Sequence, residues 1–132
     1  MPRFHDCFRS SRFWAFAFLF WFAILSVLSH GDRFQPEVTP PFPHLDKVAH
    51  FGYFFGGAGL LSAALFFKKS PHSWIKLLFI VTLTLSLIGV FDEWHQSFFE
   101  TRHGNDPGDW LADTLGALTG ALVFRKFHRV LL

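Results

Sequence analysis

The sequence predicts an all-α polytopic membrane protein: four transmembrane helices packed as a small bundle, in a single domain that covers residues 1–132. Three observations lead to this fold class. The chain contains four long apolar runs. Hydrophobic residues make up 51% of it and include 20 Phe, more than a soluble core of this size would bury. Lys and Arg also alternate in number from one connecting segment to the next, as in multi-pass membrane proteins.

The four apolar runs differ in length. A helix needs about 20 mostly apolar residues to cross a bilayer, with about 17 as the lower limit. The runs at 13–29, 48–67 and 74–91 reach this length, whereas the run at 110–124 is shorter and holds Asp113 near its start. Basic residues before the first run, and Val27 and Ser29 at its end, leave cleavage as a signal peptide open. Its length and its tryptophans favour a retained span.

Turn and cap residues predict where the helices begin. The Pro-rich stretch QPEVTPPFPHLDK predicts an irregular loop before the second span. Ser70 and Pro71 predict the N-cap and the first position of the third helix. Asp46 and Asp109 stand before the second and fourth spans, where a carboxylate can cap the free N–H groups of a helix.

Basic residues predict the orientation in the membrane. The N-terminal segment, the loop after the second span and the C-terminal segment carry three Lys or Arg each. The loop after the first span carries two, and the loop after the third span carries one. By the positive-inside rule, both termini and the second loop are therefore cytoplasmic, and the other two loops face outward.

Several classes of function are excluded by composition and motifs. The single cysteine, Cys7, allows neither an internal disulfide nor a cysteine-based zinc site. Although the net charge is +2, the basic residues follow the loops and do not gather on one segment, so no nucleic-acid partner is expected. The chain has no Gly-rich phosphate loop and no G-x-S-x-G motif. No cofactor is expected.

Polar residues predict a site where the outer ends of three spans meet. Asp92 lies sixteen residues after Lys76, about 24 Å along a helix, and thus near the outer edge of the membrane. A buried acid there costs about 2–3 kcal/mol unless it is paired or hydrated, which favours a functional role for Asp92 or Glu93. Each of the three ends carries a polar pair with i,i+4 spacing, hence on one helix face. These pairs are Asp46 with His50, Asp92 with Gln96, and Asp109 with Asp113.

Small residues predict how these helices approach one another. Gly116 and Gly120 form a G-x-x-x-G motif in the last span, and small residues at such spacings let helix backbones pack closely in lipid. The second span contains further small residues. These are Gly52, Gly56, Gly57, Gly59 and Ala63.

Two sequence blocks, DKVAHFGYFFGGAGLL and DEWHQSFFETRHGNDPGDWLADTLGALTG, resemble the VanZ-like family of small bacterial integral membrane proteins. The resemblance covers residues 46–122. Where the family usually has Asn, this chain has Asp113, and the loop after Gln96 also departs from the expected Pro-Gly-Arg form. The positions that match the family motif are Asp46, Lys47, His50, Asp92, Glu93, Gln96, Arg102, Asp109, Gly116 and Gly120.

The resemblance implies a multi-pass protein of the bacterial cytoplasmic (inner) membrane and a role in the cell envelope. The named member of the family is associated with tolerance to the glycopeptide antibiotic teicoplanin, but the resemblance implies no particular reaction. Membrane lipids are the expected surroundings, and a lipid-linked or amphiphilic small molecule is the expected ligand. The oligomeric state stays open.

Two hypotheses assign roles to the polar residues. In a binding protein, Lys47 and Arg102 would pair with phosphate or carboxylate of a polar head group. The other ligand-binding candidates are Gln96, Asp109 and Asp113.

In a membrane-embedded enzyme, His50 would act as base, Asp46 would orient it, and Asp92 or Glu93 would act as acid. A divalent metal ion is left open, because histidines and acids gather on the outer side without a recognised ligand motif. A proton path ranks last, since the inner halves of the spans are apolar.

Overall fold

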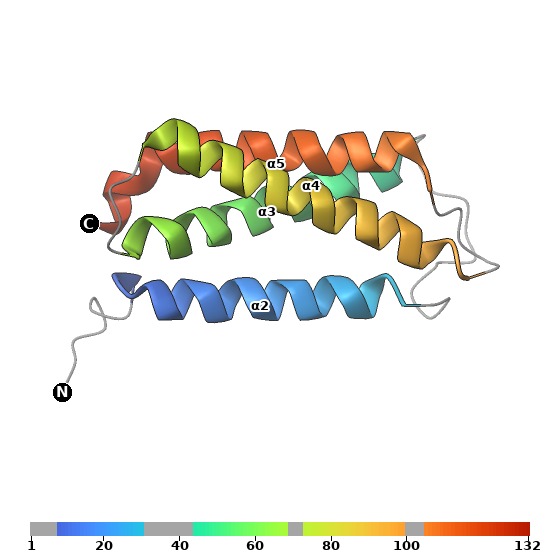
Figure 1. Cartoon of the computed structure of the whole chain (residues 1–132), viewed down its shortest axis with the longest axis horizontal. Coiled ribbons are helices and arrows are strands. Elements are labelled where there is room, and N and C mark those ends of the chain that lie inside the picture. The colour runs from blue at the N-terminus through green and yellow to red at the C-terminus, as the bar shows by residue number, and fades with distance from the viewer. Residues whose placement is uncertain (1–7, 31–43, 69–72, 100–104) are drawn as a thin grey trace.

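The structure is a computed structural model that describes residues 8–30, 44–68, 73–99 and 105–132. Four long helices run alternately up and down, so the start of α2 and the end of α5 lie at the same end of the bundle (Figure 1). The elements are α2 (Ser11–Leu28), α3 (Leu45–Phe67), α4 (Trp74–Gln96), α5 (Pro107–Phe127) and the short 3-10 helix η2 (His128–Leu131). No strand occurs in the described ranges, which confirms the all-α prediction.

Three of the helices, α2, α3 and α4, are long and apolar enough to cross a membrane. Large apolar side chains point outward on them, among them Phe16 at 73% exposure and Phe79 at 65%. Such exposure suits lipid, which solvates apolar side chains as well as a protein core does. Helix α5 has 21 residues, but it carries Asp109, Asp113, Arg125 and Lys126 and falls outside this group.

Three helices extend beyond the predicted spans at the end of the bundle where α3 and α5 begin and α4 ends. Helix α3 begins at Leu45 where the sequence predicted 48, α5 begins at Pro107 where it predicted 110, and α4 ends at Gln96 where it predicted 91. The charged residues at these ends therefore belong to regular helix. Several of their side chains pair with residues of a neighbouring helix, and Glu93 accepts the backbone N–H of Asp106, just before α5.

The predicted helix caps were wrong. The N-cap of α3 is His44, which has a left-handed backbone with φ of 64°, and Asp46 lies inside the first turn. The N-cap of α4 is Ser73, while the predicted residues 70 and 71 lie outside the described part of the chain. Asp106 caps α5 in place of Asp109 and accepts a hydrogen bond from the backbone N–H of Gly108.

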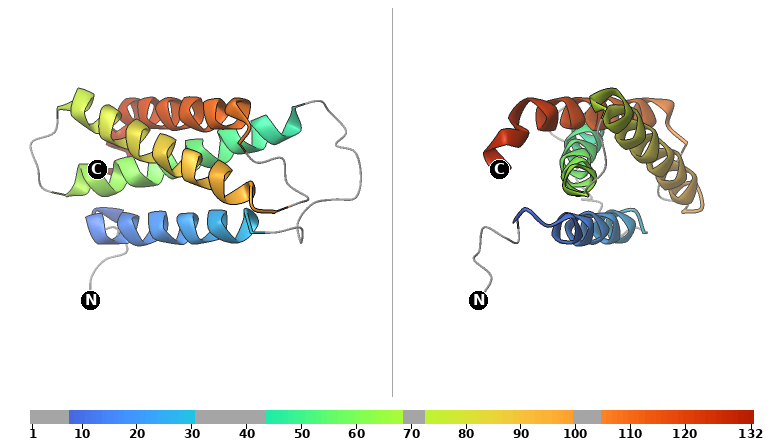
Figure 2. Two further views of the ribbon diagram at one scale, coloured as in Figure 1. Left: turned by 45° about the vertical axis from the view of Figure 1, so that its right-hand side comes forward. Right: turned by 60° about the vertical axis from the view of Figure 1, so that its left-hand side comes forward.

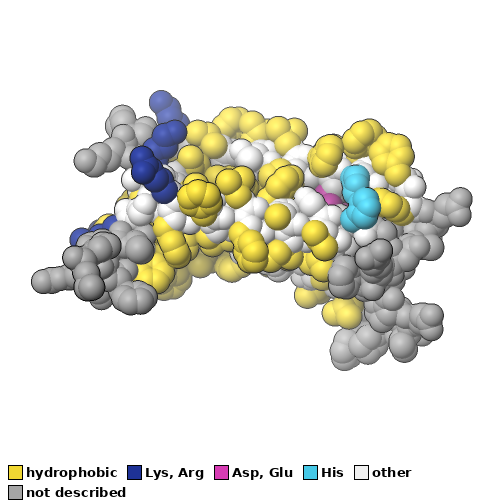
Figure 3. Space-filling view, turned by 90° about the horizontal axis from the view of Figure 1, so that it is seen from below, with side chains coloured by type: hydrophobic (Ala, Val, Ile, Leu, Met, Phe, Trp, Pro, Cys, Tyr) yellow, Lys and Arg dark blue, Asp and Glu magenta, His cyan; other side chains and the backbone are white. Residues whose placement is uncertain are grey.

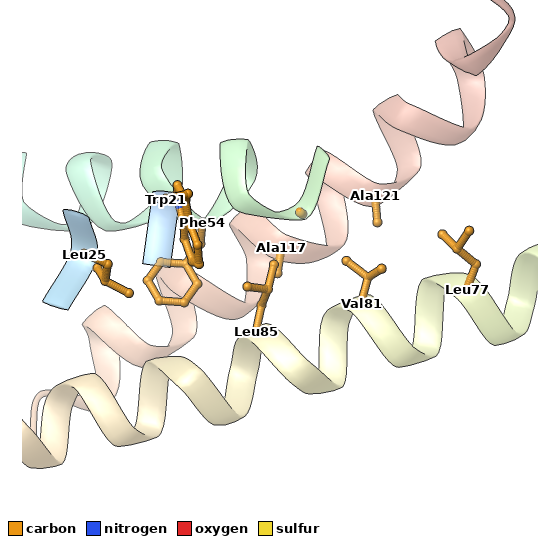
Figure 4. Packing of buried hydrophobic residues seen from close by; sticks show 9 residues of the cluster. Trp21, Leu25, Phe54, Leu77, Val81, Leu85, Ala117 and Ala121 are labelled. Carbon is orange, nitrogen blue, oxygen red and sulfur yellow. The ribbon is translucent and has the colours of Figure 1, made fainter. Parts of the chain in front are cut away.

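Helix α3 lies between α2 and α5 and also contacts α4 (Figure 2). Helix α2 buries only Trp21 and Leu25, and both pack into the core. Trp21 and Tyr53 also link α2 to α3 through two hydrogen bonds. The Trp21 indole N–H donates to the backbone carbonyl of Tyr53 at 3.1 Å, and the Tyr53 hydroxyl donates to the backbone carbonyl of Trp21 at 2.7 Å. The buried cluster is shown in Figure 4. Its members are Trp21, Leu25, Phe54, Ala58, Leu77, Val81, Leu85, Ala117 and Ala121.

Glycines of α5 bring its backbone against α3, as the G-x-x-x-G motif predicted. A Cβ atom on Gly116 would overlap the carbonyl oxygen of Phe51, and one on Gly120 would overlap the carbonyl oxygen of Phe55. On α3, the prediction that small residues form close helix contacts is confirmed only in part. Gly57 packs against the ring of Trp21, but a Cβ atom on Gly52, Gly56 or Gly59 would meet open space. Gly56 and Gly59 instead line an apolar groove of about 570 Å³ between α3 and α5.

Acidic and basic residues lie at opposite ends of the bundle. Six acidic residues of the described chain lie where α3 and α5 begin and α4 ends. Of the eight described Lys and Arg residues, seven lie toward the opposite end, and the exception is Lys47. Figure 3 shows this separation on one face, with dark blue basic side chains at one end and a recessed magenta acid beside cyan histidines at the other. The seven residues are Arg9, Arg12, Lys68, Lys76, Arg125, Lys126 and Arg129.

Candidate functional site

The candidate site is an acidic cluster at the ends of three helices. It contains every Asp and Glu in the described part of the chain, and it includes Lys47, His50 and Gln96 among them. The six acids are Asp46, Asp92, Glu93, Asp106, Asp109 and Asp113. Because the helices alternate in direction, residues separated by as many as 67 positions, from 46 to 113, meet at one end of the bundle.

Lys47 lies at the centre of the more exposed part of the cluster. Its ammonium group lies 2.7 Å from Asp106, 3.0 Å from Asp109 and 3.3 Å from Asp46. The contact with Lys47 holds the pKa of Asp106, just before α5, below its usual range. With three carboxylates around one ammonium, Lys47 ties the start of α3 to the start of α5 and has no donor left over for an incoming anion.

His50 and Asp113 pair across α3 and α5. His50 Nδ1 lies 2.9 Å from Asp113 Oδ1, and the Asp113 side chain is fully buried. The second oxygen of this carboxylate, Oδ2, has no hydrogen-bond partner. Gly89 of α4 makes room for it, because a Cβ atom there would lie 2.7 Å from Oδ2. From the sequence, Asp46 was expected to orient His50. In the structure, Asp113 contacts the His50 ring instead.

The end of α4 contributes three polar side chains, all at most 6% exposed. Gln96 donates to Asp92 Oδ2 at 2.8 Å, one helical turn away. Glu93 Oε2 accepts the backbone N–H of Asp106 at 2.9 Å, which links α4 to the start of α5. The other oxygen of Glu93, Oε1, is buried without a hydrogen-bond partner. Two carboxylates of the cluster thus each keep one unsatisfied oxygen.

A hollow of about 150 Å³ reaches part of this cluster, although neither Glu93 nor Asp113 is among its lining residues. His50, Asp92 and Gln96 supply its polar side, and apolar residues of α2 and α3 supply the rest. The apolar lining includes Leu25, Leu28, Tyr53 and Phe54. A second hollow of about 200 Å³ opens on the other side of Asp92, between His30 and His95.

The structure therefore brings together eight of the nine predicted site residues. Arg102, the ninth, lies outside the described residues. Sequence reasoning missed Asp106, which caps α5, pairs with Lys47 and donates its backbone N–H to Glu93. A signal was present: a helix often has Pro at its first position, so Asp106 before Pro107 is the better N-cap candidate.

The arrangement can do two things chemically. Its excess of carboxylates can hold a cation or a donor of several hydrogen bonds. Its His50–Asp113 pair, which resembles a base held by an orienting acid, can accept a proton.

Comparison with known proteins identifies the family. The sequence profile of VanZ/LLP1 matches residues 4–130, which include all four helices and the whole acidic cluster. No curated protein and no solved structure matches the chain. The match extends the resemblance noted over residues 46–122 to nearly the full length. The chain belongs to the VanZ/LLP1 family.

Proposed function

We propose that this VanZ-family protein binds the polar head group of an amphiphile at the outer surface of the bacterial cytoplasmic membrane, with His50, Asp92, Glu93, Gln96 and Asp113 of the acidic cluster as its binding site. The observation that carries the proposal is the pair of buried, unpartnered oxygens, Glu93 Oε1 and Asp113 Oδ2. Both residues lie next to His50, and His50 lines an accessible hollow. A buried polar group without a partner costs about 1–3 kcal/mol, and more when it is charged. A ligand that donates hydrogen bonds would offset this cost.

Charge favours a cationic head group. The cluster holds six carboxylates against Lys47 and His50, and Lys47 already contacts three of them. The earlier hypothesis, in which Lys47 and Arg102 receive a phosphate or carboxylate, would require Lys47 to leave these partners. A primary ammonium supplies the charge and three donors at once.

Size favours a head group over a whole antibiotic. Pockets for drug-sized molecules measure about 300–1,000 Å³, and the hollow beside His50 measures about 150 Å³. It suits an amino group and its nearest carbons. The remainder of the amphiphile would lie along the apolar wall formed by Leu25, Leu28 and Phe54, and then in lipid. An envelope lipid and an amphiphilic glycopeptide can both present such an amine, which connects this site to antibiotic tolerance.

The topology we propose has four crossings, with the basic end of the bundle in the cytoplasm. Its support is the separation of charge between the two ends and the length of α5, about 31 Å at 1.5 Å per residue. Lys and Arg are retained on the cytoplasmic side during insertion. The acidic cluster would then face outward, and α5 would cross the membrane beside α3.

Cysteine labelling tests this topology. In a Cys7→Ser background, Ser97→Cys is expected to react with a membrane-impermeant maleimide in intact cells, because Ser97 is exposed at the acidic end. Ser73→Cys, exposed at the basic end, is expected to react only after the membrane is permeabilised. Equal labelling of the two variants in intact cells would contradict the proposal.

Binding is tested by native mass spectrometry of the detergent-purified protein. Phosphatidylethanolamine, which carries an ammonium, is expected to stay bound in preference to phosphatidylglycerol, which has none. Glu93→Gln and Asp113→Asn are expected to weaken retention about tenfold, because a hydrogen bond to a charged group contributes about 1.5–3 kcal/mol. Teicoplanin serves as a competitor for the same site.

Asp46→Asn is the matched control, since it also turns an acid into an amide but alters a carboxylate that is 57% exposed and already paired with Lys47. Its lipid retention should equal that of the unaltered protein. Equal retention of the two lipids, or equal loss in the control, would argue against head-group recognition by the buried acids.

A second candidate, a membrane-embedded enzyme that acts on an envelope lipid, is favoured by one observation. His50 is paired with Asp113 and lies within reach of both Asp92 and Glu93, as an acid–base mechanism requires. The same mass spectra separate the two candidates, because an enzyme would release a lipid fragment and His50→Gln would stop its release.

A further inference from the structure

We infer that His50, Asp92 and Glu93 form a binding site for a divalent transition-metal ion, with Zn²⁺ and Mn²⁺ as the best candidates. Each residue offers one ligand atom, and these atoms lie within 4.8 Å of one another. Around a tetrahedral ion with bonds of about 2.1 Å, neighbouring ligand atoms are about 3.4 Å apart. Small rotations of the side chains would therefore bring all three to bonding distance. The inference does not depend on head-group binding: an ion on Glu93 Oε1 would occupy the oxygen that the proposed function offers to an ammonium, and Asp113 Oδ2 would remain available.

Each of the three ligands is already oriented by a partner. His50 Nδ1 is engaged by Asp113, which leaves Nε2 for the ion. Asp92 receives the Gln96 amide on Oδ2, and Glu93 receives the Asp106 N–H on Oε2, which leaves Oδ1 and Oε1 for the ion. A histidine held by a carboxylate through its other nitrogen is the usual arrangement in protein metal sites.

Glu93 Oε1 supplies the independent indication of a ligand. The Glu93 residue is 4% exposed, and this oxygen has no hydrogen-bond partner. Two adjacent acids at the membrane edge, both buried, carry a desolvation cost that is hard to offset with neutral groups. A divalent cation would neutralise the two carboxylates together, and the neutral imidazole would complete a donor set suited to Zn²⁺ or Mn²⁺.

The site would leave one coordination position open. Its three ligands come from α3 and α4 only. His50 and Asp92 also line the hollow of about 150 Å³, which provides an entry path for the ion. In catalytic and ligand-binding metal sites the fourth position holds water or substrate. Here it would face this hollow.

A second group of three acids in the cluster has similar spacing but is already neutralised by Lys47. Asp46, Asp106 and Asp109 also bring their oxygens within 4.8 Å of one another. The ammonium of Lys47 lies 2.7–3.3 Å from all three and already satisfies them. Within the described part of the chain, no Lys or Arg forms an ion pair with His50, Asp92 or Glu93. The second trio therefore serves as an internal control.

The test is metal titration of the tag-free protein in lipid nanodiscs, after removal of metal with EDTA. Zn²⁺ or Mn²⁺ is expected to bind at one ion per chain, measured by competition with a fluorescent chelator. His50→Gln and Glu93→Gln are expected to weaken binding at least 100-fold. Asp113→Asn, which changes no ligand of the ion but alters the positioning of His50, is expected to weaken metal binding 10–100-fold. Asp46→Asn should bind as the unaltered protein does.

X-ray absorption of the Zn²⁺-loaded protein provides a readout that needs no variant. One nitrogen and two or more oxygen ligands at about 2.0–2.2 Å are expected, with no sulfur. The inference would be overturned by the lack of saturable binding, by equal affinity of His50→Gln and the unaltered protein, or by a sulfur ligand. If the protein shows no saturable metal binding but still retains phosphatidylethanolamine, this inference alone would be overturned and the proposed function would stand.

Discussion

Replacing Gly116 by leucine is expected to lower the free energy of unfolding by about 3 kcal/mol or more, at the upper end of the range for overpacked cores. A side chain at position 116 would overlap the carbonyl oxygen of Phe51. The obstacle is helix backbone, which cannot rotate away as a flexible side chain could. Helix α5 would have to move away from α3, and the contacts of Asp109 with Lys47 and of Asp113 with His50 would be lost together. Steric-trapping measurements in bicelles report this free energy directly.

Gly52→Leu is the matched control for this prediction. Gly52 is also a helix glycine, but it is exposed, and a Cβ atom there meets nothing within 4 Å. Its substitution should change the unfolding free energy by less than about 1 kcal/mol, as surface substitutions usually do. Similar losses for Gly52→Leu and Gly116→Leu would show that the seam between α3 and α5 does not depend on Gly116.

Replacing His50 by leucine is expected to cost about 3–5 kcal/mol of stability, the range seen when one partner of a buried ion pair is removed. Asp113 is fully buried, and its Oδ2 already lacks a partner. Without His50, its Oδ1 would lose its partner as well, and the whole carboxylate would be buried without a hydrogen bond. Thermal or steric-trapping unfolding measures the loss, with EDTA present so that no metal ion contributes.

A double-mutant cycle isolates the pair. Adding Asp113→Asn to His50→Leu removes the buried carboxylate that His50→Leu leaves without a partner. The double variant should therefore be about 2 kcal/mol more stable than the sum of the two single losses in unfolding free energy predicts. His95→Leu is the control, because His95 makes ring contacts with His30 and Phe99 that an apolar side chain can replace. Strict additivity of His50→Leu and Asp113→Asn would mean that the two residues do not stabilise one another.

The sequence predicted the helical architecture well because lipid imposes simple requirements. An apolar run of sufficient length must be a helix in the bilayer, and α2, α3 and α4 satisfy that requirement. The G-x-x-x-G motif likewise predicted a close backbone contact, since only glycine leaves the space that Phe51 and Phe55 occupy. The cap residues were harder to predict: Asp46, Asp109 and Ser70 each suited a cap, and the actual caps are His44, Asp106 and Ser73.

Residue spacing alone indicates which residues share a helix face and at which depth, because helix rise and periodicity do not depend on the neighbouring helices. It therefore predicted that the ends of three helices present acids, histidine and lysine at a similar level. The pairing of these side chains could be read only from the folded bundle. Asp113, not Asp46, holds His50, and Asp106 joins Lys47 to Glu93. Partners on different helices depend on how α5 crosses α3. This crossing is set by the contacts of Gly116 and Gly120 with backbone that lies 65 residues earlier in the chain, at Phe51 and Phe55.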